Sequence, residues 1–135
     1  MAGSDAGVIP YLSFAGQARA ALVFYEQAFA ATDTATMPDQ ADPDRLMHGQ
    51  TLINGGMVMV CDQAGADAPT GSPLPHGHLQ LVVADGARWW QRAIDAGCQV
   101  VVPYARQFWG DDWGLLVDPY GIRWGVLQTG AAATA

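Results

Sequence analysis

The chain has 135 residues, which suits a single domain, and half of them are hydrophobic while only 14% are charged, so it is not a disordered chain. Its formal net charge of −7 argues against nucleic acid and anionic membrane surfaces as partners, and it is compatible with a cationic or neutral small ligand. No apolar run approaches the length of a membrane span and the first residues lack a signal-peptide pattern, so we expect a cytoplasmic protein.

The first half of the chain is predicted to form a strand, a helix and three more strands. The helix follows from apolar residues that recur at helical spacing. The last two strands form a hairpin, because the Asn54-Gly55 pair can take the positive φ values of a tight type I′ turn. The expected strand, helix, strand, loop and two hairpin strands are, in this order, 8–14, 16–31, 32–37, 38–44, 45–53 and 57–62.

The same order of elements returns after a linker at 63–77 that is rich in Gly, Pro and Ala. Asp85 is expected to cap the N-terminus of the second helix, Gly97 to end that helix, Pro103 to close the next strand, and Asp118 to stabilise a turn. The expected strand, helix, strand, hairpin strand, turn and final strand are 78–83, 85–97, 98–103, 113–117, 118–121 and 122–128. A domain of residues 1–135 would therefore contain two βαβββ modules, 8–62 and 78–128.

Three stretches resemble a known superfamily. They are "PYLSFAGQARAALVFYEQAF", "MHGQTLINGGMVMVCD" and "QFWGDDWGLLVDPYGIRWGVLQ". With the repeated element order, they make the chain similar to the vicinal oxygen chelate superfamily (glyoxalase I, bleomycin resistance proteins and extradiol dioxygenases), above all to its PhnB-like branch. The resemblance implies an α+β fold in which two βαβββ modules form a curved mixed sheet around a cleft. It also implies a homodimer.

The resemblance further implies where the metal ligands of the superfamily would fall. These positions are Pro10, Met59, His78 and Gly125. Proline, methionine and glycine cannot supply a hard oxygen or nitrogen ligand from their side chains. We therefore expect neither the superfamily's ordinary metal site nor any other cofactor.

Two polar pairs lie two residues apart on predicted strands, so each pair shares one face of its strand. They are His48 with Gln50 and His78 with Gln80. These side chains could orient a ligand, satisfy one another, or hold an atypical metal. His78 or His48 could also act as an acid–base catalyst, but no carboxylate partner is evident on these strands.

Aromatic and apolar residues complete the candidate ligand site. Phe108, Trp109 and Trp113 bracket Gly110, where they could stack on a flat ligand or act as a structural wedge. Strand alternation predicts an apolar cleft floor with a few polar groups, as in a binding pocket. This floor comprises Pro10, Leu12, Met57, Met59, His78, Gln80, Gly125 and Leu127. Gly125 is expected to make room for a close approach of the ligand.

These observations favour a metal-independent small-molecule binding protein over an enzyme. The bleomycin-resistance members sequester a drug without changing it, so the leading hypothesis is binding of an aromatic or peptide-type antibiotic. The alternative is a lyase, isomerase or dioxygenase-type enzyme that uses His78 and His48. A third hypothesis is an accessory protein that binds a macromolecular partner and no small ligand.

Overall fold

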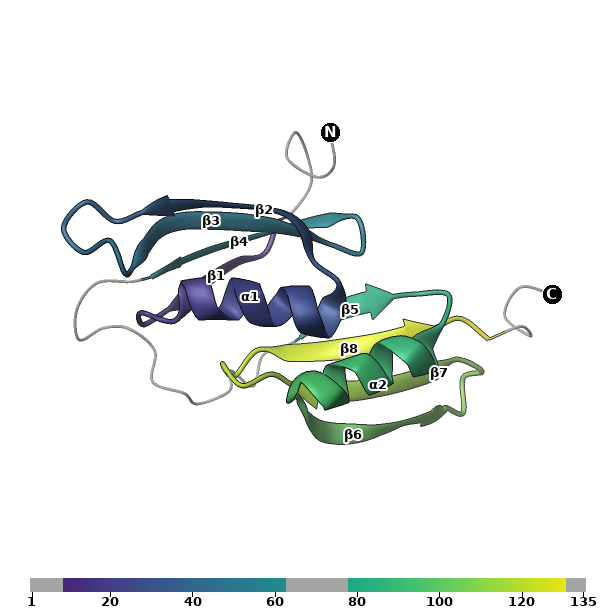
Figure 1. Cartoon of the computed structure of the whole chain (residues 1–135). Helices are drawn as coiled ribbons and strands as arrows, with labels where there is room; N and C mark the ends of the chain where they lie inside the picture. Colours follow the sequence, from purple (N-terminus) through teal and green to yellow (C-terminus); the bar gives the residue numbers. More distant parts are fainter. Residues whose placement is uncertain (1–8, 63–77, 131–135) are drawn as a thin grey trace. The chain divides into compact units, whose positions relative to one another are not determined.

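The structure is a computed structural model that describes residues 9–62 and 78–130. The predicted linker at 63–77 lies outside these residues. The chain divides into two compact units, 1–70 and 71–135, and each holds a four-stranded mixed sheet and one helix (Figure 1). The predicted α+β class and the repeated βαβββ order are confirmed.

The first module has the strand order β1-β4-β3-β2, in which β1 runs parallel to β4 and the other neighbours are antiparallel. The hairpin turn is the predicted one, because Asn54 and Gly55 take φ values of 52° and 80°. The elements are β1 (Tyr11–Phe14), α1 (Ala18–Phe29), β2 (Thr32–Pro38), β3 (Leu46–Ile53) and β4 (Gly56–Asp62).

The second module repeats this arrangement with the strand order β5-β8-β7-β6. Both predicted helix ends are confirmed: the carboxylate of Asp85 accepts a hydrogen bond from the backbone N–H of Arg88 at 3.2 Å, and Gly97 ends the helix with φ 123°. The elements are β5 (Leu79–Val82), α2 (Gly86–Ala96), β6 (Gln99–Arg106), β7 (Asp112–Val117) and β8 (Arg123–Gln128).

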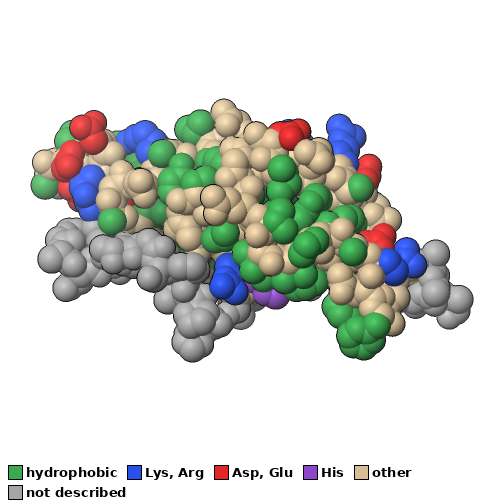
Figure 2. All heavy atoms as spheres, turned by 90° about the horizontal axis from the view of Figure 1, so that it is seen from below, with side chains coloured by type: hydrophobic (Ala, Val, Ile, Leu, Met, Phe, Trp, Pro, Cys, Tyr) green, Lys and Arg blue, Asp and Glu red, His purple; other side chains and the backbone are tan. Residues whose placement is uncertain are grey.

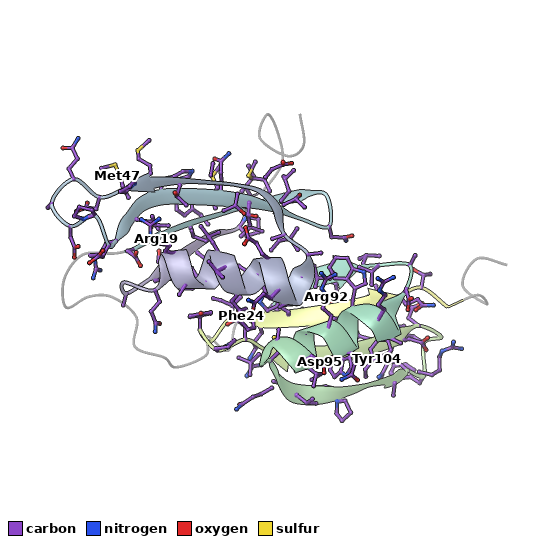
Figure 3. All side chains as sticks on the ribbon, in the orientation of Figure 1. Arg19, Phe24, Met47, Arg92, Asp95 and Tyr104 are labelled. Atoms are coloured by element: carbon purple, nitrogen blue, oxygen red, sulfur yellow. The ribbon has the colours of Figure 1, made fainter. Side chains whose placement is uncertain are left out.

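Each helix covers one face of the sheet in its own module (Figure 1). In the first module, Leu22, Tyr25 and Phe29 of α1 are buried, and Met47 on β3 points away from the helix (Figure 3). In the second module, Tyr104 points from β6 toward α2, where its ring stacks on Trp90 at 5.5 Å between ring centroids (Figure 3). The opposite face of each sheet, which we call the helix-free face, is therefore the one available for a ligand.

In both modules a side chain at the end of the last strand holds the start of the helix. The carboxylate of Asp62 accepts hydrogen bonds from the backbone N–H groups of Gly16 and Ala18 at 2.7 and 3.0 Å. The amide oxygen of Gln128 accepts from the backbone N–H of Gly86 at 2.8 Å. These contacts satisfy N–H groups at, or just before, the first residue of each helix, which have no partner within the helix.

Asp118 has the structural role that the sequence predicted. Its buried carboxylate accepts hydrogen bonds from the backbone N–H groups of Tyr120 and Ile122 at 2.9 and 3.0 Å. It also accepts from the indole N–H of Trp124 at 3.0 Å, and Trp124 is itself buried beneath α2. The turn between β7 and β8 is thus tied to the core of the second module.

The expectation that Pro103 closes its strand is wrong. β6 continues through Pro103 to Arg106. Proline is tolerated there because β6 is an edge strand and its register with β7 shifts between Val102 and Ala105, so no ladder hydrogen bond from this residue is required. Among the described residues, no helix is long and apolar enough to cross a membrane.

Candidate functional site

The helix-free face of the second module gathers most of the predicted site residues of that module. Trp124 and Val126 of β8 are buried on the helix side, so the alternating residues Arg123, Gly125 and Leu127 belong to the helix-free face. The register places Gln80 beside Gly125 from one side, and Leu115 beside it from the other. Trp113 is opposite Leu127 in the same register.

A hydrogen-bond network fixes the polar groups on this face. The amide Oε1 of Gln80 accepts from the indole Nε1–H of Trp113 at 3.0 Å and lies 2.8 Å from Nε2 of His78. Because an indole nitrogen can only donate, the atom it contacts must be the amide oxygen. His78 must then donate from Nε2. In the neutral imidazole, Nδ1 is therefore the nitrogen that accepts a hydrogen bond.

Gly125 makes room for this polar pair, and not for a ligand as expected from the sequence. A Cβ atom at position 125 would lie 2.5 Å from Oε1 of Gln80 and 2.9 Å from Nε2 of His78. Such distances are shorter than van der Waals contact. The absence of a side chain at Gly125 is thus what allows His78 and Gln80 to lie against the middle of the sheet.

Aromatic rings extend this site along the sheet in a continuous row. Trp113 lies 6.0 Å from His78 and 6.3 Å from Trp109, and Trp109 lies 5.0 Å from Phe108, all between ring centroids. Phe108 is 97% exposed and Trp109 is 48% exposed. Figure 2 shows hydrophobic side chains at the surface of one face of the molecule. The structure therefore brings Phe108, Trp109 and Trp113 together with His78 and Gln80, and a large apolar surface remains in contact with water.

The acidic residues beside this aromatic row are engaged in contacts of their own. Asp112 forms an ion pair with Arg106 at 2.6 Å, and the carboxylate of Asp111 accepts a hydrogen bond from the backbone N–H of Gly130 at 3.0 Å. Both carboxylates thus stabilise the segment that carries Trp109 and Trp113.

The first module has a comparable polar group on its own helix-free face. The hydroxyl of Tyr11 is 2.8 Å from Nδ1 of His48, and Nε2 of His48 is 3.1 Å from Oε1 of Gln50. Partial burial, with a smaller contribution from Cys61, raises the pKa of the Tyr11 hydroxyl, so this group keeps its proton at neutral pH. It can therefore donate to Nδ1 of His48, whose Nε2–H then points to Gln50.

The register of the first module corrects one predicted site residue. Met57 and Met59 pair with Leu52 and Gln50, so they belong to the helix-free face as expected. Leu12 does not, because it pairs with Val60, which is completely buried on the helix side. Tyr11, which pairs with Met59, takes the place predicted for Leu12. A one-residue difference in the register moves every side chain of a strand to the other face.

The positions implied for a metal do not fit one. Gly125 has no side chain, and the space beside it is filled by His78 and Gln80. Pro10 offers only its carbonyl, which already accepts a hydrogen bond from the backbone N–H of Met59 at 2.9 Å. The thioether of Met59 suits soft metals only. Within residues 9–62 and 78–130, no three His, Cys, Asp or Glu side chains form a group that could hold a metal ion.

The predicted ligand-binding set leaves out Arg123, although alternation with Trp124 in the sequence already indicates that Arg123 faces the cleft. Arg123 lies on the helix-free face, two residues before Gly125, and its Nε atom is buried with no hydrogen-bond partner among the residues that the structure describes. The signal was available in the sequence, because Arg123 precedes a tryptophan that belongs to the core and therefore points the other way.

Comparison with known proteins agrees with this architecture. The sequence matches the family described as Glyoxalase/Bleomycin resistance protein/Dioxygenase superfamily over residues 8–126. The chain belongs to this superfamily. An uncharacterized protein of Mycobacterium bovis is 35% identical to this chain over 121 residues, which cover 82% of this chain and 76% of the relative. Protein YjdN of Escherichia coli is 26% identical, covering 85% of this chain and 90% of its own length.

Solved structures show the superfamily fold over almost the whole chain. A protein from Pseudomonas aeruginosa has a TM-score of 0.72 at 23% identity and covers 93% of this chain and 99% of its own. The PhnB protein from Bacillus cereus has a TM-score of 0.69 at 18% identity, with 93% and 100% covered. The fosfomycin resistance protein FosX from Mesorhizobium loti has a TM-score of 0.61 at 11% identity, with 97% and 98% covered. At these identities the likeness establishes the fold alone.

Proposed function

We propose that this chain is a metal-independent binding protein that holds an aromatic small molecule on the helix-free face of its second module. Its role would be to sequester an aromatic or peptide-type antibiotic. The observation that carries the proposal is the row of rings from Phe108 to His78, which ends in a fixed hydrogen-bonding pair.

The physical support comes from what such a row does to a flat molecule. Each stacked aromatic contact contributes about 0.5–1.5 kcal/mol beyond the burial of its area. Trp109 and Trp113 supply the stacking surface, while Nδ1 of His78 and the amide NH2 of Gln80 offer an acceptor and a donor. A site with apolar walls and a few fixed polar groups is typical of small-molecule binding.

The proposed role in drug resistance rests on the family. The description of the superfamily includes bleomycin resistance protein, and one structural neighbour is a fosfomycin resistance protein. The donor set at Pro10, Met59 and Gly125 argues against a hard divalent metal in the bound state. Binding that leaves the ligand chemically unchanged is compatible with such a site.

An enzyme of the lyase, isomerase or dioxygenase type is the second candidate. It is favoured by one observation, the orientation of His78, whose Nδ1 is left as the acceptor nitrogen. Such a nitrogen could remove a proton from a bound substrate. Incubation of the protein with each ligand that it binds, followed by mass spectrometry, separates the two: an unchanged mass supports sequestration, and turnover that is lost in His78→Gln supports the enzyme.

A ligand panel tests the proposal. Neutral, cationic and anionic aromatic compounds, including aromatic and peptide-type antibiotics, are added to the protein and the shift in Tm is measured, because a bound ligand stabilises the native state. Hits are then titrated by quenching of tryptophan fluorescence. We expect Trp113→Ala to weaken binding at least 10-fold, while Trp89→Ala, on the helix, leaves it unchanged. The absence of binding across the panel, or binding that survives Trp113→Ala, would contradict the proposal.

A further inference from the structure

Arg123 is a charged group on the proposed binding face that the hydrogen-bond network does not use. Its Nε atom is buried, and within residues 9–62 and 78–130 no hydrogen-bond acceptor reaches it. The other arginine at this sheet, Arg106, is engaged differently, because its Nε donates to Asp112. A buried donor that forms no hydrogen bond is unfavourable, and this cost is recovered when a ligand supplies the acceptor.

The position of Arg123 relates it to the polar pair. Leu79 pairs with Trp124 in the parallel ladder of β5 and β8, so the preceding residues, His78 and Arg123, come next in the same register. Gln80 and Gly125 are the next pair on the same face. Arg123, His78 and Gln80 therefore lie along one end of the helix-free face, and Trp113 lies on the far side of Gln80.

Among the strands β5, β7 and β8, the charge on the helix-free face is of one sign. The strands β5, β7 and β8 carry two charged residues, Asp112 and Arg123. Asp112 is neutralised by Arg106 and, by alternation with Trp113, belongs to the helix side. Asp118 is held on the helix side with Trp124. Although the whole chain has a net charge of −7, the charged side chain that these three strands present on the helix-free face is thus positive, and the nearby carboxylate of Asp111 is held by the backbone N–H of Gly130.

We infer that the ligand of this site is a planar aromatic carboxylate whose anionic group pairs with the guanidinium of Arg123 while its ring system stacks on Trp113. The inference rests on the proposed binding function and names the ligand class. It replaces the cationic or neutral ligand that the net charge of the chain suggested. The Nε–H and one terminal N–H of a guanidinium are parallel donors that match the two oxygens of a carboxylate.

The remaining contacts are consistent with such a ligand. The carboxylate takes Arg123, which leaves Nδ1 of His78 as an acceptor and the NH2 group of Gln80 as a donor for polar atoms on the ring system. In a ligand with a ring hydroxyl or ring N–H near its carboxylate, the carboxylate pairs with Arg123 and the ring O–H or N–H donates to Nδ1 of His78. Specificity then comes from the polar end of the site, and most of the apolar contact comes from the tryptophans.

The test compares matched ligands. A panel of bicyclic and tricyclic aromatic carboxylates, each with its own carboxamide, is titrated by isothermal calorimetry against the wild-type chain, Arg123→Gln, Arg123→Lys and Arg106→Gln. We expect the carboxylates to bind about 10- to 100-fold more tightly than their amides. Arg123→Gln removes this difference between acid and amide, Arg123→Lys restores part of it, and Arg106→Gln, which removes the same charge elsewhere, preserves it.

The outcomes distinguish a failure of this inference from a failure of the proposed binding function on which it rests. If the amides bind as well as the carboxylates, or if Arg106→Gln acts like Arg123→Gln, the inference fails while aromatic binding stands. If neither series binds, both fail. Thermal unfolding verifies that each variant is folded, and the comparison of acid with amide on the wild-type chain decides the question should Arg123→Gln not fold.

Discussion

The hydrogen bond between Trp113 and Gln80 joins two strands that are not neighbours. Trp113 is on β7 and Gln80 is on β5, and β8 runs between them. The bond passes over Gly125, the residue of β8 that pairs with Gln80 in the register. A side chain at position 125 would clash with the amide of Gln80, so the hydrogen bond requires glycine at this position.

Gly125→Ala tests this dependence. The new methyl group would lie within 3 Å of Gln80 and His78, both of which can move because the atoms in question are ends of side chains. We expect ligand affinity to fall at least 10-fold, with a loss of only about 1 kcal/mol in the free energy of unfolding. The matched control is Gly56→Ala, where a Cβ atom meets nothing closer than 3.6 Å. Equal effects of the two substitutions on calorimetric binding constants would show that Gly125 has no special role.

The tautomer of His78 follows from the indole of Trp113. In the wild-type chain we expect the neutral ring to carry its proton on Nε2, which long-range ¹H–¹⁵N NMR correlations report directly. Trp113→Phe keeps an aromatic ring but removes the N–H that orients the amide, so Gln80 can turn and a mixture of tautomers should appear. A wild-type spectrum of the Nδ1–H tautomer would refute this arrangement.

Phe108 and Trp109 are expected to serve binding and not stability. Because Phe108 is 97% exposed, Phe108→Ala should change the free energy of unfolding by less than about 0.5 kcal/mol. Aromatic ligands should nevertheless bind several-fold more weakly to Phe108→Ala and Trp109→Ala. Denaturant unfolding and fluorescence titration measure the two effects. A structural wedge would give the opposite pattern, with lost stability and intact binding.

Asp118→Asn is expected to destabilise the second module. The amide can replace one acceptor oxygen, but it turns an NH2 group toward donors that now bind a carboxylate, including the indole N–H of Trp124. The expected loss is about 1–3 kcal/mol. Asp95→Asn, at an exposed position on α2 where the carboxylate accepts from Gln91, should cost under about 0.5 kcal/mol in the same chemical denaturation experiment.

Cys98 gives the chain a pH dependence at alkaline pH. Burial, with a smaller contribution from Asp118, raises the pKa of its thiol from 9.0 to about 12. The folded state keeps the proton that the unfolded state loses above pH 9, so the contribution to stability is complete below that pH and is lost as pH approaches 12. The slope is at most about 1.4 kcal/mol per pH unit. Denaturation of Cys98→Ala between pH 9 and 11 should show a shallower slope than the wild type, and equal slopes would contradict the burial of the thiol.

Local signals in the sequence were sufficient for most of the fold. Asn54-Gly55, Asp85 and Gly97 are residues whose own conformational preferences determine the structure around them, and each behaves as predicted. Asp118 belongs to the same group, because its carboxylate binds the backbone a few residues away. The repeated element order then predicted two modules. In each of them the helix can bury only one face of its own sheet.

The errors occur where a residue's role depends on its partner strand. Alternation within 8–14 cannot reveal which residues face the helix, and the pairing with β4 puts Tyr11, and not Leu12, on the helix-free face. Pro103 is compatible with a strand only because β6 lies at an edge, which depends on the order of the strands. The role of Gly125 likewise required knowing that Gln80 is its neighbour across the sheet.

The contacts that hold the helix starts have a consequence for how each module assembles. Asp62 and Gln128 are each the last residue of their module's final strand, yet they bind N–H groups at the beginning of the helix, more than 40 positions earlier along the chain. The first and last strands of each module also pair in parallel. During synthesis, neither helix gains these N-terminal hydrogen bonds until the end of its module has emerged, so we expect each module to form cooperatively as one folding unit, with the first complete before the second.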